Sequence, residues 1–225
     1  MKNLNIKAFG GLAFLIIVMA LVFFLPAGTF NYWQAWVFLI VFGTSTLAVT
    51  LYLMKNDPKL LERRVNAGPG AEKETTQKII QSIASIAFIL VIVFPAVDYR
   101  FRWSNVPPYI SIIGDIFVAL GLFIVFLVFK ENSFTSGTIE VEANQKVIST
   151  GPYAIIRHPM YAGAFIMLIG VPIALGSFWG LLTIIPLISV IIWRLLDEEE
   201  ILKKKLSGYL EYQKKVKYRL VPYFW

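Results

Sequence analysis

The stretch GPYAIIRHPMY, residues 151–161, concentrates polar side chains that could bind a charged small molecule. It contains the only histidine of the chain, beside an arginine and between two tyrosines. Proline suits the first turn of a helix, so Pro159 predicts a helix that leaves His158 at its N-terminus. Free N–H groups there favour a carboxylate, and the rings of Tyr153 and Tyr161 could face a cation. The alternative is an interfacial anchor, because aromatic and basic residues are common at membrane boundaries.

A second polar stretch, WRLLDEEEILKKKLSGYLEY, occupies residues 193–212 and follows a long apolar run. Residues four apart share one face of a helix, which would place Arg194 beside Glu198, with Glu199 on a neighbouring face. The three lysines 203–205 suit a cytoplasmic helix that binds anionic lipid headgroups. Four consecutive acids at the same place do not fit that role, because anionic lipid would repel them.

The elements that must position these stretches are membrane helices. The chain has 225 residues, 57% of them hydrophobic and 16% charged, and the apolar residues form blocks long enough to cross a bilayer. Backbone groups in lipid must be satisfied internally, so each block is expected to be a helix. The sequence therefore predicts an all-α, polytopic integral membrane bundle. About six segments are expected, at residues 8–25, 33–54, 79–97, 109–129, 161–175 and 178–193.

The last two segments are separated only by Gly176 and Ser177, which predicts a tight helical hairpin. Both are short, which leaves open whether each crosses the bilayer. We expect two parts, with N-terminal membrane helices in residues 1–130. Residues 131–225 would form a binding core, made of the hairpin and a cytoplasmic C-terminal helix.

Basic residues are concentrated in alternate loops. If the N-terminus is inside, only Arg100 and Arg102 of the 21 basic residues lie outside. The positive-inside rule then predicts that both termini, and both polar stretches, lie on the cytoplasmic face. The same loops account for the net charge of +7, so no nucleic-acid partner is expected.

A hairpin returns its two ends to each other, so His158 and Tyr161 can face Arg194 and Glu199. Such a pocket would combine a carboxylate binder, a cation binder and aromatic faces. S-adenosylmethionine (SAM) requires this set, since its methionine end is a zwitterion and its sulfonium is a cation. No metal is expected, and the absence of cysteine excludes thiolate metal sites.

Three motifs together resemble the isoprenylcysteine carboxyl methyltransferase family, which includes related phospholipid methyltransferases. They are GPYAIIRHPMYAG, RLLDEEEIL and GYLEYQKKVKYRLVP, and the resemblance covers residues 145–222. The tail YRLVPYFW is more similar to the bacterial branch. The resemblance thus implies an enzyme of the bacterial inner membrane, with its active site on the cytoplasmic face.

The resemblance also implies which residues hold SAM and the methyl acceptor. The cofactor ligands would be Gln145, Lys146, Val147, Ile148, Tyr153, His158, Pro159, Met160, Tyr161 and Glu199. Arg194 would bind the carboxylate of the acceptor. The acceptor would be lipophilic, either a prenylcysteine-like carboxylate or a lipid headgroup. Membrane lipids are further expected partners.

Methyl transfer is an in-line displacement at the S-methyl carbon, so positioning and desolvation can supply most of the rate. If the acceptor is an amine, a base must remove a proton, and Glu198 or His158 could do so. The sequence leaves the acceptor atom and the oligomeric state open.

Two other functions are alternatives. A membrane reductase of the sterol or 5α-steroid type has a similar C-terminal architecture, but its NADPH would require basic residues where the acidic pair stands. A non-catalytic scaffold or transporter subunit is the second alternative. Transporters tend to carry charge or broken helices at mid-membrane, whereas the polar groups here lie at one face.

Overall fold

The computed structural model describes residues 2–66, 69–72, 74–139, 141 and 145–225, and within these ranges it has helices but no strand. This confirms the all-α prediction. The α-helices are α1 (Lys2–Ala27), α2 (Trp33–Asn56), α3 (Pro58–Val65), α4 (Thr75–Phe101), α5 (Pro108–Glu131), α6 (Pro159–Ala174), α7 (Ile184–Lys205) and α8 (Tyr209–Lys215). Short 3-10 helices are η1 (Pro69–Ala71), η2 (Gly151–Ala154) and η3 (Trp179–Thr183).

Five helices in the described ranges are long and apolar enough to cross a membrane: α1, α2, α4, α5 and the continuous Trp179–Lys205. The predicted polytopic membrane bundle is therefore confirmed. The fifth predicted segment, α6, has only 16 residues. At 1.5 Å per residue it spans about 24 Å, less than the roughly 30 Å of a hydrocarbon core. The last helix instead runs beyond residue 193 through the four acids, since Glu and Lys are good helix formers.

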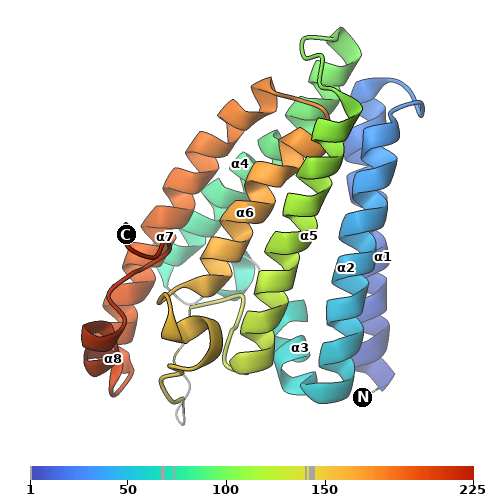
Figure 1. Ribbon diagram of the computed structural model, residues 1–225. Helices are drawn as coiled ribbons and strands as arrows, with labels where there is room; N and C mark the ends of the chain where they lie inside the picture. The colour runs from blue at the N-terminus through green and yellow to red at the C-terminus, as the bar shows by residue number, and fades with distance from the viewer. Residues whose placement is uncertain (1, 67–68, 73, 140, 142–144) are drawn as a thin grey trace.

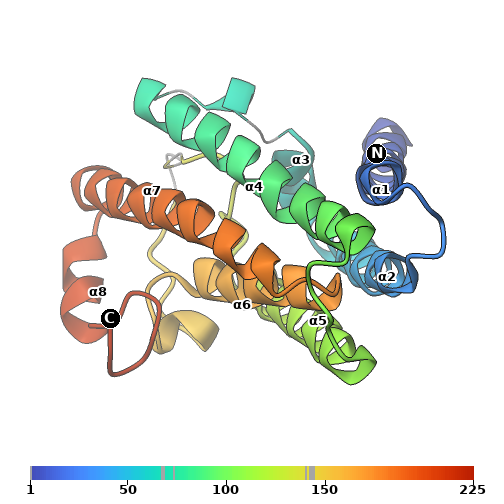
Figure 2. The ribbon, with the colours of Figure 1, turned by 90° about the horizontal axis from the view of Figure 1, so that it is seen from above.

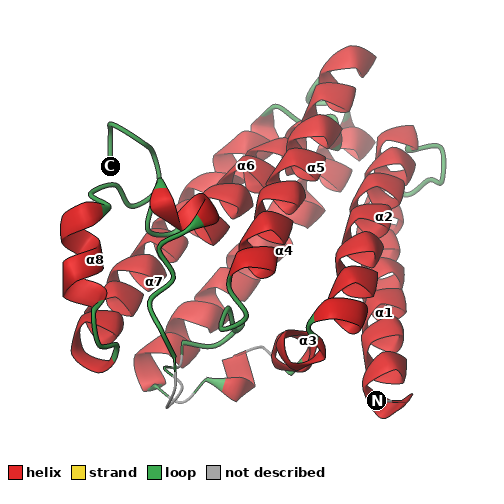
Figure 3. Cartoon of the chain, turned by 60° about the horizontal axis from the view of Figure 1, so that its bottom comes forward, coloured by secondary structure: helices red, strands yellow, loops and turns green. Residues whose placement is uncertain are grey.

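The long helices form a ring in which α1 contacts α2 and α4, α2 contacts α5, and α4 contacts α7. Helix α6 packs mainly on α5 and also contacts α7 (Figures 1 and 2). The N-terminus, α3 and α8 lie toward one end of the bundle in Figure 1. Figure 3 turns this end forward and shows α3, α8 and the loop that joins α5 to α6.

Glycines allow α5 and α6 to approach closely. Gly114 and Gly121 on α5 face Gly163 and Gly170 on α6, and the two glycines of each helix are seven residues apart, on one face. A Cβ on Gly121 would lie 2.5 Å from the carbonyl oxygen of Gly163, and one on Gly170 would lie 2.6 Å from that of Gly114. Small residues let membrane helices pack backbone to backbone. This contact fixes α6, and with it the functional stretch at its N-terminus, against α5.

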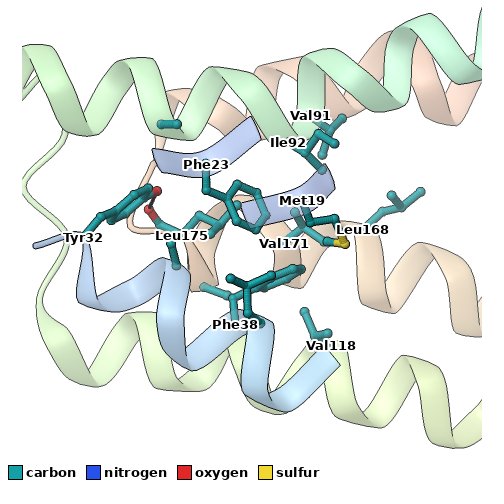
Figure 4. Close-up of a cluster of buried hydrophobic side chains, with 14 of the residues drawn as sticks. Met19, Phe23, Tyr32, Phe38, Val91, Ile92, Val118, Leu168, Val171 and Leu175 are labelled. Carbon is teal, nitrogen blue, oxygen red and sulfur yellow. Dashed lines mark hydrogen bonds between the residues drawn. The ribbon is translucent and has the colours of Figure 1, made fainter. Parts of the chain in front are cut away.

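A buried apolar cluster fills the ring between these helices. Phe23 of α1, Phe38 of α2 and Val171 of α6 belong to it, and Figure 4 shows their side chains pointing toward one another. The hydroxyl of Tyr32 donates to the carbonyl oxygen of Leu175 at 2.5 Å. Because Leu175 ends α6, this bond ties the hairpin turn to the start of α2.

The predicted hairpin turn is formed by Gly176, whose φ of 72° suits glycine, and by Ser177. The buried carboxylate of Asp98 on α4 accepts hydrogen bonds from the hydroxyls of Ser177 and Ser104. The Ser177 hydroxyl oxygen also accepts from the N–H of Gly180 at 2.8 Å. The turn is thus anchored at the far end of the bundle, which directs the start of α6 and the end of α7 to the end that carries α3 and α8.

Candidate functional site

A cavity at this end lies between the loop after α5, the start of α6, and helices α7 and α8; we call it the loop cavity. Nine of the ten residues predicted to bind the cofactor line it, all except Glu199. Its lining is Asn132, Phe134, Thr135, Ser136, Thr138, Ile139, Gln145, Lys146, Val147, Ile148, Tyr153, Arg157, His158, Pro159, Met160, Tyr161, Glu198, Leu202, Leu206, Tyr209 and Tyr212. The fold therefore brings residues 145–161 together with residues 198–212, which lie about fifty positions later in the sequence.

The start of α6 has the predicted geometry. Pro159 is the first helical residue and His158 precedes it as the N-cap, buried at 6% exposure. The C-terminal tail holds this turn in place, because the N–H groups of Arg157 and His158 donate to the carbonyl oxygens of Tyr218 and Arg219, each at 2.9 Å. The motif near residue 157 and the tail therefore form one structural unit.

The carboxylate of Glu199 is the centre of a buried ionic cluster. It is 1% exposed and accepts from Nε of Arg157 at 2.7 Å and from Nε of Arg219 at 2.9 Å, and it lies 3.2 Å from Nε2 of His158. Two guanidinium groups satisfy a buried carboxylate well. Glu199 does not line the loop cavity, so its predicted contact with the cofactor stays a prediction.

Glu198, and not Glu199, lines the wall of the loop cavity. Its Oε2 accepts a hydrogen bond from the hydroxyl of Tyr161 at 2.7 Å. No basic side chain in the part of the chain that the structure describes forms an ion pair with Glu198. The wall thus presents a carboxylate that forms no ion pair among the described residues, although the positive charge of Arg194 lies near it.

Arg194 lies near Tyr161 and Glu198, as predicted, but its guanidinium is already engaged. Nη1 donates to Oε1 of Gln77 at 2.8 Å, and Nη2 donates to Oε1 of Glu72 at 2.8 Å and to the carbonyl oxygen of Gly137 at 3.1 Å. The sequence did not indicate the two side-chain partners, Glu72 and Gln77, because both lie in the polar stretch between the predicted membrane segments 33–54 and 79–97. The available signal was Gln77, an amide at the start of a membrane helix.

An aromatic wall completes the loop cavity. The hydroxyl of Tyr212 donates to the carbonyl oxygen of Tyr153 at 2.8 Å, and Nδ2 of Asn132 donates to the hydroxyl of Tyr153 at 3.0 Å. Burial raises the pKa of the Tyr153, Tyr209 and Tyr212 hydroxyls, so all three stay neutral. The Tyr209 hydroxyl is buried and makes no hydrogen bond within the described residues. An orphaned buried hydroxyl is costly, which suggests a polar ligand opposite it.

Two further spaces meet the loop cavity at the first turn of α6. One is a polar pocket that contains Arg64, Arg194 and Glu198, here called the junction pocket, with a volume of about 260 Å³. The other, the membrane groove, runs along α1, α2, α5 and α6 and has a volume of about 550 Å³. Met160 and Tyr161 line all three spaces. The turn that Pro159 begins therefore separates a polar site from an apolar one.

The comparisons with known proteins agree with this architecture. Residues 109–207 match the family model for phospholipid methyltransferases. A sequence comparison with curated proteins finds no match. The matched region contains nearly all of α5, all of α6 and α7, and most of the lining of the loop cavity, but not Tyr209 and Tyr212 of α8. This match confirms the resemblance stated from the motifs. It also supports a membrane methyltransferase that acts on a lipid-like substrate. Residues 109–207 are therefore similar to the phospholipid methyltransferases.

Proposed function

We propose that the protein transfers a methyl group from SAM, bound in the loop cavity, to a lipophilic acceptor that enters from the membrane groove. The observation that carries this proposal is that Met160 and Tyr161 line both spaces. A water-soluble donor and a membrane-bound acceptor need two compartments that meet at the reacting atoms. The first turn of α6 is where such compartments meet in this fold.

The side chains of the loop cavity fit the donor. Glu198 supplies an anion without a basic partner among the described residues, which suits the ammonium or the sulfonium of SAM. The Tyr209 hydroxyl supplies a neutral donor that needs an acceptor. The N–H groups at the start of α6 favour the carboxylate of the methionine end. When bound, SAM supplies an electrophilic methyl group.

The size of the loop cavity sets a condition on binding. Its volume is about 100 Å³, whereas ligand pockets usually measure roughly 300 Å³ or more. A ligand that contains a nucleoside therefore has to widen the cavity. Loop residues on one of its walls, such as Thr135 and Val147, belong to no helix, so this widening need not disturb the α5–α6 contact.

Tyr161 and Glu198 are proposed to act at the reacting atoms. The hydrogen bond from Tyr161 fixes one carboxylate oxygen of Glu198 and leaves the other available. For an amine acceptor that oxygen is positioned to take the proton, as a general base. For a carboxylate acceptor no base is needed, and Arg194 is the residue predicted to hold it. An acceptor there has to compete with Glu72, which already pairs with Arg194 at 2.8 Å.

Glu199 is proposed to act through its neighbours. It holds Arg157 and His158 on one side and Arg219 on the other. These contacts set the direction in which α6 presents its N-terminus to the loop cavity. We assign Glu199 a positioning role and Glu198 the direct contact with the donor.

A thermal-shift experiment on the purified protein in neutral detergent tests the proposal against the reductase alternative. SAM and S-adenosylhomocysteine are expected to raise the melting temperature, because both carry the zwitterionic end that the site fits. NADPH is expected to have no effect. A shift with NADPH alone would support the reductase and contradict the proposal.

A further inference from the structure

We propose that Arg64 binds the anionic group of a membrane amphiphile, with a carboxylate or phosphate headgroup, whose hydrocarbon chain lies in the membrane groove. This deepens the proposed function, on which it rests, because such an amphiphile is then the methyl acceptor. It also places the determinant of acceptor choice in α3, outside the matched region 109–207.

Arg64 lies at the boundary between the apolar and the polar space. It lines the membrane groove and also the junction pocket. Its guanidinium carbon stands 5.0 Å from the ring centre of Phe129, and Nη1 donates to the carbonyl oxygen of Ser136 at 3.2 Å. Both contacts leave most of its five N–H donors available to a ligand.

Within the described residues, the charge of Arg64 has no ion-pair partner. No acidic side chain of the described residues forms an ion pair with it, whereas the nearby Arg194 is paired with Glu72. Burial lowers the pKa of Arg64; the interaction with Tyr161 opposes this shift, and the positive charge of Arg194 adds to it. A partly desolvated cation without a counterion is unfavourable, so an anion is expected to bind beside it.

The membrane groove suits a hydrocarbon chain. Its walls include Leu12 and Leu15 of α1, Phe42 of α2 and Met167 of α6. Its charged lining residues in the described part of the chain are Lys7 and Arg64, both basic. A groove that is apolar along its length and basic where it meets the junction pocket matches an amphiphile with one anionic headgroup.

The position of Arg64 also orients such an amphiphile for the reaction. Arg64 and Tyr161 line both the membrane groove and the junction pocket. Of these two spaces, Glu198 lines the junction pocket and not the groove. An anion is attracted to Arg64 and repelled by Glu198, so the headgroup is held on the groove side of the junction. Its reacting atom then faces Tyr161 and the loop cavity.

The test measures binding of the amphiphile directly and needs no SAM. Radiolabelled dodecanoate, dodecyl phosphate and dodecanol are titrated onto the purified protein in a sugar-headed neutral detergent. For the wild type we expect tighter binding of the two anions than of the alcohol. Arg64→Gln should weaken the binding of both anions by about 30-fold, because it removes one partner of a desolvated charge pair. The affinity for dodecanol should stay unchanged, because the alcohol carries no charge.

Two further variants provide the matched controls. Lys59→Gln removes the same charge from the exposed side of α3 and should bind all three ligands as the wild type does. Arg64→Lys keeps the charge but loses the planar fork, so it should recover part of the affinity. Comparison of dodecanoate with dodecyl phosphate identifies which headgroup the site prefers.

The inference is overturned if Arg64→Gln retains the wild-type preference for anions, or if Lys59→Gln loses that preference equally. Failure of the proposed function gives a different result, namely absence of SAM binding in the wild type with the anion preference intact. The two outcomes are therefore distinguishable.

Discussion

The hydroxyl of Tyr161 donates a hydrogen bond of 2.7 Å to Oε2 of Glu198 and thereby joins the first turn of α6 to α7. Both residues line the loop cavity and the junction pocket. The pair thus stands between the space assigned to the donor and the space assigned to the acceptor. Most of the functional predictions depend on this arrangement.

Glu198→Gln is expected to weaken SAM binding by about 30-fold, because truncating one partner of a desolvated charge pair costs at least about 2 kcal/mol. Isothermal titration of purified protein measures the change. Glu200→Gln is the matched control, since Glu200 is exposed and forms an ion pair with Lys203 at 2.6 Å. Wild-type affinity in Glu198→Gln would remove this carboxylate from the donor site.

Glu199→Gln is expected to destabilise the fold by about 3–5 kcal/mol, because it leaves two partly or fully buried guanidinium groups without their anion. A lower midpoint in thermal unfolding, relative to Glu200→Gln, is the readout. Arg219→Gln should cost less, since Arg219 is 30% exposed. If Glu199→Gln melts as the wild type does but no longer binds SAM, Glu199 is a direct ligand and not a positioning residue.

Tyr209→Phe should separate stability from binding. The Tyr209 hydroxyl has no partner among the described residues, so its removal is expected to leave the melting temperature unchanged or slightly raised. The affinity for SAM should fall by about fivefold, because the variant loses one hydrogen bond that contributes about 1 kcal/mol to binding. Tyr212→Phe is the contrasting variant and should lower stability, because its hydroxyl bonds to the carbonyl oxygen of Tyr153. Unchanged SAM affinity in Tyr209→Phe would mean that the hydroxyl has no role in binding.

The orientation in the membrane can be tested with single cysteines, since the chain contains none. The basic loops predict that Asn105 lies outside and Lys217 lies in the cytoplasm. A membrane-impermeant maleimide applied to intact cells should label Asn105→Cys and not Lys217→Cys. Permeabilised cells should show labelling of both. The reverse pattern in intact cells would place the loop cavity on the outer face.

Much of the fold could be predicted from local sequence. Long apolar runs specify helices in lipid, Gly176 specifies the hairpin turn, and Pro159 specifies the start of α6. The short α6, Pro159–Ala174, agrees with the segment expected at residues 161–175. The end of α7 was missed, because the helix continues past the apolar run to Lys205. The predicted division of the chain at residue 130 stays a prediction, and the α5–α6 contact crosses it.

The site could be predicted only in part. The gathering of residues 145–148 and 158–161 follows from the motifs, but the choice between Glu198 and Glu199 does not. Adjacent residues on a helix point about 100° apart, so the rotation of α7 decides which carboxylate faces the cavity. In the structure Glu199 bonds to Arg219 of the tail, and Glu198 lines the cavity.

The residues of the acceptor side were missed for a related reason. Arg64 and Glu72 lie in a short helix and a loop whose sequences contain no motif. They reach the site because α3 and the segment before α4 pack at the same end of the bundle as Arg194. Glu72, which bonds to Arg194, precedes it by 122 residues in the sequence. Pairings over such distances are tertiary and leave no periodic signal in sequence.

The most direct test of the central claim uses methyl-tritiated SAM and the purified protein in vesicles made from lipids of the host cell. After incubation, the lipids are extracted into organic solvent and counted. The account predicts tritium in the organic phase with wild-type protein, and a strong loss of incorporation with Glu198→Gln but not with Glu200→Gln. Tritium that stays entirely in the aqueous phase, from protein shown to bind SAM, would contradict methyl transfer to a lipophilic acceptor.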